Sequence, residues 1–224
     1  MTLSEMFASS VLNDPHVRPG TTTAGHVNLH SGYKPIDVRS VTTVLVAYVD
    51  GAPVDILHHQ VSAEFELAAG RPRSIPFIQP VPWETPFTRL NGLALTDVVV
   101  GLRTKVTATS HTQTDDLMPL EIHPTSGHWR LLEATRRLGW HVEGSIVTAA
   151  QMPGVRQSDP FLQRFVLRSP QDVSALWVAF VANPVGVDTL IGDDRGNQLQ
   201  LAVSHAHQGP DPAEAISDWL DERQ

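Results

Sequence analysis

The side chains best suited to chemistry in this sequence are its eleven histidines. The closest spacings along the chain are His58-His59, His26 with His30, His123 with His128, and His205 with His207. Alternate residues of a strand share one face, so His205 and His207 have the spacing to bind one metal ion together. A metal site needs a third ligand, however, and none stands at a recognisable spacing. We therefore expect surface or turn histidines, with no metal and no cofactor.

Two pairs of aspartates raise calcium binding or acid–base catalysis as alternatives. Asp115 and Asp116 lie just before residue 119, where the residue pattern changes from strand-like to helix-like. Asp193 and Asp194 begin the run DDRGN. This run lacks the spacing of a calcium loop and its terminal bidentate glutamate. We interpret both pairs as solvated turns.

Other sequence patterns of catalysis are missing. The sequence contains no GxSxG, P-loop or GxGxxG pattern, and it contains no cysteine to act as a thiol nucleophile. We therefore predict that the protein is not an enzyme.

Charge and hydropathy restrict the partners. The chain has 16 Lys and Arg against 24 Asp and Glu, a net charge of −8, and no basic stripe. Nucleic-acid binding and attachment to anionic membranes both depend on concentrated basic residues, so neither is expected. The N-terminus lacks the pattern of a signal peptide, and no stretch approaches the roughly 20 apolar residues of a membrane span. We expect a soluble, cytoplasmic protein.

The elements that must position these side chains are mostly strands in the first half of the chain. VSAEFEL (61–67) and DVVVGLRTKV (97–106) alternate between apolar and polar residues, as strands of half-buried antiparallel sheets do. Turn residues fall between such segments, including the Asn-Gly pair at 91–92. This pattern predicts a β-sandwich over residues 1–120.

The residue pattern changes from strand alternation to helical spacing near residue 119. TSGHWRLLEATRRLG predicts a short amphipathic helix at 126–138, with a cap at Thr125 or Ser126 and a stop at Gly139. Strand patterns resume over 140–206, and DPAEAISDWLDERQ predicts a C-terminal helix capped by Asp211. We predict a second antiparallel β-sandwich over residues 121–224, with one helix at the junction and one at the C-terminus, and hence an all-β fold class.

The order of several segments resembles the bacterial sporulation-control (stage-zero M) proteins, which have an arrestin-like fold. The resemblance spans roughly residues 11–183. The segments that carry it are VRPGTTTAGHVNLHSG, IPFIQPVPWETPFT, VVVGLRTKVTATSHTQTDDLMPLEIHP, LLEATRRLGW and PFLQRFVL. It implies two arrestin-like β-sandwich domains and a non-enzymatic regulatory role in sporulation control.

The proline-rich segment IPFIQPVPWETPFT also needs a structural explanation. Prolines confine it to an edge strand or an extended crossover, and its apolar residues require burial. Both this argument and the resemblance indicate that Phe77, Trp83 and Phe87 anchor the segment to a core. We expect Trp83 to stabilise the first domain.

Charged residues near the predicted boundary suggest contacts between the domains. Salt bridges from Arg136 or Arg137 to Asp115, Asp116 or Glu121 would set the angle between them. An ordinary exposed helix face is the alternative interpretation.

The favoured function is a regulatory adaptor that acts through protein–protein contacts. Unpaired strands at the sandwich edges offer backbone groups to other proteins, and they offer a route to homo-oligomers. A carbohydrate- or ligand-binding β-sandwich is one alternative, and a histidine-based metal-dependent enzyme is another. Fold alone does not decide among them, because function requires a site.

Overall fold

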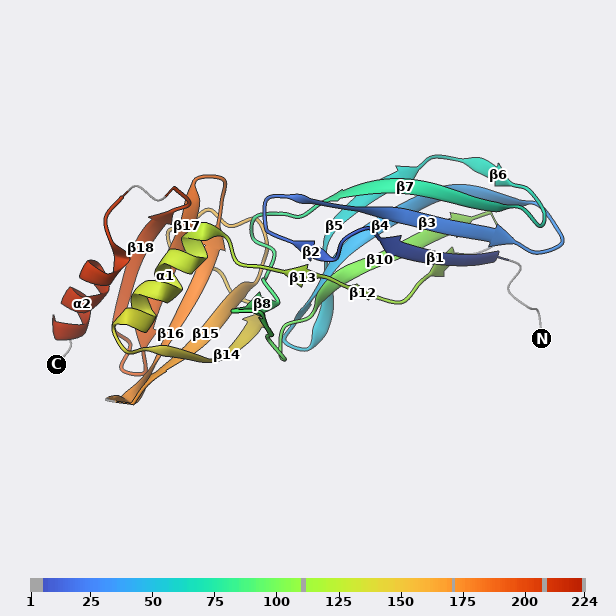
Figure 1. Ribbon diagram of the computed structural model, residues 1–224. Coiled ribbons are helices and arrows are strands. Elements are labelled where there is room, and N and C mark those ends of the chain that lie inside the picture. Colours follow the sequence, from blue (N-terminus) through green and yellow to red (C-terminus); the bar gives the residue numbers. More distant parts are fainter. Residues whose placement is uncertain (1–5, 110–111, 171, 207–208, 223–224) are drawn as a thin grey trace.

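The computed structural model describes residues 6–109, 112–170, 172–206 and 209–222. Its strands form two groups that lie end to end, with the N-terminal group on one side and the two helices on the other (Figure 1). The predicted all-β fold is confirmed, and the strands of its three larger sheets pair in the antiparallel direction.

The N-terminal group is a sandwich of two antiparallel sheets. The smaller sheet has the order β1 (Met6–Leu12), β3 (Thr22–Ser31), β7 (Pro72–Pro80). The main path of the larger sheet is β11 (Thr112–Thr114), β10 (Val100–Ala108), β4 (Ile36–Val49), β5 (Ala52–Ser62). Two short strands extend it, β12 (Met118–Pro119) beside β10 and β6 (Phe65–Leu67) beside β4.

Alternation of side chains builds the core of this sandwich. The predicted inward residues Val98, Val100, Leu102, Thr104 and Val106 are all buried. The segment 61–67, predicted as one strand, is divided between β5 and β6.

The proline-containing strand β7 lies at the edge of the smaller sheet, as proline requires. Its exposed positions include Pro76 and Pro80, while the alternate residues Ile75 and Phe77 are buried. Gln79, also buried, accepts a hydrogen bond at Oε1 from Thr43 Oγ1 of the facing sheet at 2.6 Å.

Among the described residues of the C-terminal group, the strands of 141–204 form one sheet, where a second sandwich was predicted. Its five antiparallel strands follow one another in chain order: β14 (His141–Thr148), β15 (Leu162–Ser169), β16 (Asp172–Ala182), β17 (Gly186–Asp193) and β18 (Gln198–Ser204). In place of a second sheet, α1 (Ser126–Arg137) and α2 (Pro212–Glu222) supply the second layer (Figure 1). The helices can do so because Leu131, Ala134 and Ile216 form apolar stripes that join the sheet's core.

Local signals set the ends of both helices. Thr125 precedes α1, and Gly139 beyond its end has a positive φ of 86°, which glycine adopts without strain. Asp211 caps α2 by accepting a hydrogen bond from the N–H of Ala213 at 3.0 Å. Both predicted helices are confirmed.

The proline-rich segment joins the two groups, which corrects the expected role of its second half. Phe77 lies in the first sandwich, but Phe87 is only 1% exposed and stacks on Phe165 of β15, with 5.0 Å between ring centroids. Trp83 is half-buried and stacks on His205, with 5.1 Å between centroids. The segment thus contributes to the second core, although it precedes the predicted boundary at residue 120.

Candidate functional site

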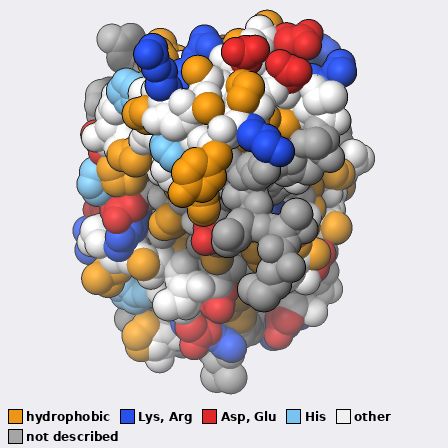
Figure 2. Space-filling model, turned by 90° about the vertical axis from the view of Figure 1, so that its right-hand side faces the viewer, with side chains coloured by type: hydrophobic (Ala, Val, Ile, Leu, Met, Phe, Trp, Pro, Cys, Tyr) orange, Lys and Arg blue, Asp and Glu red, His pale blue; other side chains and the backbone are white. Residues whose placement is uncertain are grey.

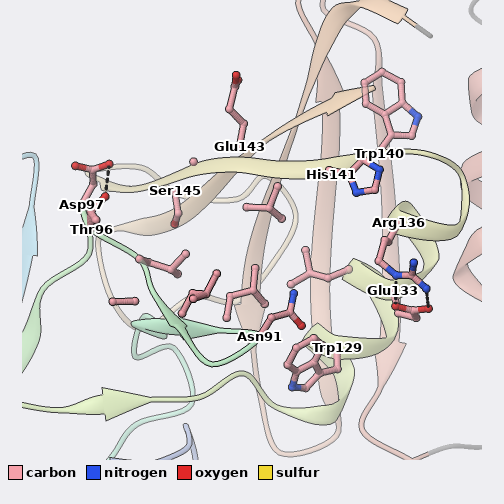
Figure 3. A pocket seen from close by; sticks show the side chains of 17 residues that line it. Asn91, Thr96, Asp97, Trp129, Glu133, Arg136, Trp140, His141, Glu143 and Ser145 are labelled. Carbon is pink, nitrogen blue, oxygen red and sulfur yellow. Dashed lines mark hydrogen bonds and ion pairs between the residues drawn. The ribbon is translucent and has the colours of Figure 1, made fainter. Parts of the chain in front are cut away.

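A pocket of about 410 Å³ lies on the C-terminal half, between α1, β14 and a small hairpin (Figure 3). The hairpin consists of β8 (Arg89–Leu90) and β9 (Leu93–Ala94). The apolar residues that line the pocket are Leu90, Leu93, Ala94, Leu95, Trp129, Leu132, Trp140 and Val142. Its polar lining residues are Asn91, Thr96, Asp97, Glu133, Arg136, His141, Glu143 and Ser145.

The hairpin is shaped by the Asn-Gly pair recognised in the sequence. Asn91 and Gly92 both have positive φ, 52° and 79°, as in the tight turns that match the twist of a hairpin. Arg89 fixes the hairpin's base, because its Nη2 lies 2.6 Å from Oε1 of Glu121. The turn leaves Leu93 with 73% of its surface exposed at the mouth of the pocket.

Helix α1 and Trp140, three residues beyond its end, supply the apolar floor. Leu132 and Trp140 are buried, and Trp129 is half-buried. The N–H of Trp140 donates to the carbonyl of Thr135 at 2.9 Å, which turns the chain back toward the sheet. The floor is therefore rigid, and the hairpin forms the exposed wall.

The pocket opens beside an edge strand. Among the described residues, β14 pairs only with β15. One end of its outer edge is closed, since Asp50 donates its N–H to the carbonyl of Val147 at 2.9 Å. Asp50 Oδ2 also accepts a hydrogen bond from the N–H of Ala149, which lowers the pKa of this carboxyl. Toward His141, the described chain places no strand against this edge, so its outward backbone groups have no strand partner there.

Three of the four Asp, Glu and Arg side chains that line the pocket form ion pairs. Arg136 forms two hydrogen bonds with Glu133, at 2.8 and 2.6 Å, and these lower the pKa of Glu133. Glu143 points away from the other lining side chains (Figure 3) and pairs with Arg168 at 3.0 Å. The arrangement suits a neutral, apolar side chain better than a charged ligand.

The predicted salt bridges between domains are wrong. Arg136 pairs with Glu133 one turn earlier in α1, and Arg137 pairs with Asp211 at 2.7 Å, because both arginines face α2 or solvent and not the sandwich. Glu121 does lie at the junction, but its partners are Arg89 and His16.

The predicted aspartate turns are only partly solvated. Asp115 is half-buried and accepts a hydrogen bond from the N–H of Thr104 at 2.7 Å, while burial raises its pKa. Asp116 is exposed in the following loop. Asp193 is buried, and its Oδ1 accepts hydrogen bonds from the N–H groups of Arg195 and Asn197, which organises the turn after β17.

Most of the histidine pairs found in the sequence do not converge on a site. His205 is held by Asn183 and Trp83, and His207 lies outside the described residues. His128 is buried among aromatic rings, and burial lowers its pKa to about 3.

One cluster was missed by sequence reasoning: His16, Glu121 and His123 lie together although His16 is far away in the chain. No local spacing signals such a contact.

A β-sandwich joined to a helix-backed sheet, with a pocket at an open strand edge, defines a class of two-part, β-rich proteins. The family model described as SpoOM protein (Spo0M) matches residues 8–197, and the chain belongs to this family. The predicted resemblance is confirmed.

Solved structures support the same fold. Spo0M, the sporulation control protein from Bacillus subtilis, is similar over 99% of this chain and 100% of its own, with a TM-score of 0.83 and 18% identity. The DNA glycosylase AlkC from Pseudomonas fluorescens, bound to DNA containing an abasic site analog, matches over 53% of this chain and 30% of its own, with 13% identity. Its TM-score of 0.35 is too low to indicate a shared fold. A comparison with curated proteins gave no match.

Proposed function

We propose that this protein is a non-enzymatic, cytoplasmic regulator that binds an extended segment of another protein in the pocket beside β14. Its family is one of sporulation control, which supports a regulatory role. The observation that carries the proposal is the combination of an apolar hollow with unpaired backbone groups on the adjacent strand edge. An extended peptide can use both features at once, because its backbone can pair with the edge of β14 while its side chains enter the pocket.

The chemistry of the pocket indicates what that segment carries. The buried floor and the exposed Leu93 favour one or two bulky apolar side chains at alternate positions of the segment. The paired charges at the rim offer little to a charged anchor. A sugar would need an open aromatic face for stacking, whereas Trp140 is only 4% exposed and Trp129 is half-buried.

Other surfaces give weaker support for a specific partner class. At the sandwich end of the molecule, acidic, basic and hydrophobic side chains are intermixed (Figure 2). No helix among the described residues has the length and apolar character needed to cross a membrane.

Site-specific photo-crosslinking in the native host tests the proposal. A photoreactive amino acid at Asn91, on the pocket's rim, should cross-link to a partner that mass spectrometry identifies together with the attached segment. Leu93→Asp should abolish the adduct because it places a charge in the apolar wall. Val185→Asp is the matched control, since Val185 is similarly exposed, at 76% against 73%, on a turn away from the pocket.

A synthetic peptide of the captured segment then provides the quantitative measurement. Its affinity should fall at least tenfold in Leu93→Asp and stay within twofold in Val185→Asp. An adduct that persists in Leu93→Asp contradicts the proposed pocket. An adduct formed only with a second copy of the chain would replace binding of another protein by self-association.

A further inference from the structure

Three side chains with metal-binding chemistry meet where the two halves of the molecule join. The short strand β2 (His16–Val17) pairs in parallel with β13 (Glu121–Ile122), and the register places His16 opposite Glu121. His123 follows two residues after Glu121, so it lies on the same face of the pair. Both strands occupy the region between the sandwich and the helix-backed sheet (Figure 1).

The distances among the three side chains fit a single small ion. Nδ1 of His16 lies 3.3 Å from Oε2 of Glu121 and 3.5 Å from Nε2 of His123. All three ligand atoms lie within 4.8 Å of one another. A tetrahedral site with metal–ligand bonds of about 2.0–2.2 Å places neighbouring ligand atoms roughly 3.3–3.6 Å apart.

The backbone under this cluster is held firmly. The N–H of His123 donates to the carbonyl of Val17 at 2.8 Å, and the N–H of Glu121 donates to that of Pro15 at 2.9 Å. Ile122, between the two ligands, is fully buried. The ligands therefore project from a fixed base, which reduces the entropy lost on binding.

Arg89 orients the carboxylate without occupying both of its oxygens. Its Nη2 contacts Oε1 of Glu121 at 2.6 Å, which leaves Oε2 facing His16. A partner that fixes a ligand in this way is typical of metal sites. The positive charge of Arg89 opposes a cation, so we expect moderate affinity. The His16 side chain is 57% exposed, which leaves an open path for an ion and for a water ligand.

We propose that His16, Glu121 and His123 form a binding site for a divalent transition metal. Two imidazole nitrogens and one carboxylate oxygen are a ligand set that Zn²⁺ accepts, with water in the fourth position. The bound ion would connect the segment before β3 with the segment that leads into α1, and so fix the two halves relative to each other. This proposal is independent of the peptide pocket.

Titration of Zn²⁺ into the tag-free, full-length protein tests the site. Isothermal calorimetry should show one equivalent bound, and the midpoint of thermal unfolding should rise. His16→Ala and Glu121→Gln should each weaken binding at least tenfold; both side chains are partly exposed, and circular dichroism verifies that the variants fold. Co²⁺ provides a second readout, since a four-coordinate site gives visible absorption bands that His16→Ala should remove.

His58→Ala is the matched control. His58 also lies beside a carboxylate, with 3.1 Å between its Nε2 and Oδ2 of Asp55, but it is not part of the His16–Glu121–His123 cluster. The affinity of the His58→Ala variant for Zn²⁺ should match that of the unchanged protein. Zn²⁺ binding that His16→Ala and His123→Ala leave unaltered would overturn the proposal, as would the absence of binding to the unchanged protein.

Discussion

Phe77 and Phe87 lie ten residues apart in one proline-rich segment, yet they pack in different halves of one continuous hydrophobic core. Phe77 is buried in the N-terminal sandwich, whereas Phe87 contacts Phe165 and Phe180 of the C-terminal sheet. The segment therefore connects the packing of one half to the packing of the other. The division between the two packed halves therefore differs from the predicted division of the chain near residue 120. The two halves should consequently influence each other's stability.

The largest expected effect separates the two phenylalanines. Phe87→Ala should destabilise the protein by about 3–5 kcal/mol, as expected for removal of a buried ring. Hydrogen exchange followed by mass spectrometry should show faster exchange first in β15 and β16. Phe77→Ala should instead affect β3 and β4 first. Phe7→Ala is the control, because Phe7 is 62% exposed and should have little effect. Identical exchange patterns for the two core variants would contradict the assignment of Phe77 and Phe87 to different halves.

A substitution of Gln163 tests how the C-terminal half holds the proline-rich segment. Its Oε1 accepts a hydrogen bond from the N–H of Phe87 at 3.0 Å, and its Nε2 donates to the carbonyl of Phe87 at 2.8 Å. Gln163→Leu keeps the volume but leaves both backbone groups unpaired, which should cost about 1–3 kcal/mol. Urea unfolding measures the loss, and the exposed Gln198→Leu should be neutral. An unchanged midpoint for Gln163→Leu would show that these bonds do not hold the segment.

His128 makes the second core sensitive to acid. Its pKa is about 3 in the folded protein, lowered by burial from 6.5. The unfolded chain therefore binds more protons below pH 6.5, and folding stability should fall by up to about 1.4 kcal/mol per pH unit, or about 2 kcal/mol by pH 5. Urea unfolding between pH 7.5 and 5 should reveal this slope.

The variant His128→Gln should remove most of that slope, and His58→Ala, at an exposed site, should preserve it. Asp159 acts in the opposite direction, because burial and Glu84 raise its pKa to about 6. Its contribution is fully present below the unfolded pKa near 3.8 and is lost as pH rises through about 6. In Asp159→Asn the acid-induced loss should therefore become steeper. A profile that His128→Gln leaves unchanged would assign the acid sensitivity to other groups.

The smallest expected effect concerns Trp83, which contacts both halves. Its ring stacks on His205, and a Cβ added at Gly20 would lie 2.4 Å from it, so the ring packs directly on Gly20. Because Trp83 is only half-buried, Trp83→Ala should cost about 1–2 kcal/mol. Hydrogen exchange should increase at both contact points. An effect confined to the sandwich would restore the sequence-based expectation that Trp83 stabilises the first domain alone.

Elements with local signals could be predicted from the sequence. The alternation in 97–106 gave the buried face of β10, and Thr125, Gly139 and Asp211 marked the helix ends. The Asn-Gly pair at 91–92 marked the hairpin, and prolines placed β7 at an edge. These succeeded because period, capping and turn chemistry act between residues a few positions apart.

Contacts between segments distant in the chain could not be predicted in this way. Strand β17 carries no alternating pattern because nearly all its residues are buried, and the second layer of the C-terminal half is helical where a second sheet was predicted. Phe87 could be recognised as an anchor, but not as an anchor of the second core. The pocket and the His16–Glu121–His123 cluster each combine segments that are distant in the chain. Contacts of this kind depend on how apolar faces pack in three dimensions, and no spacing along the sequence encodes them.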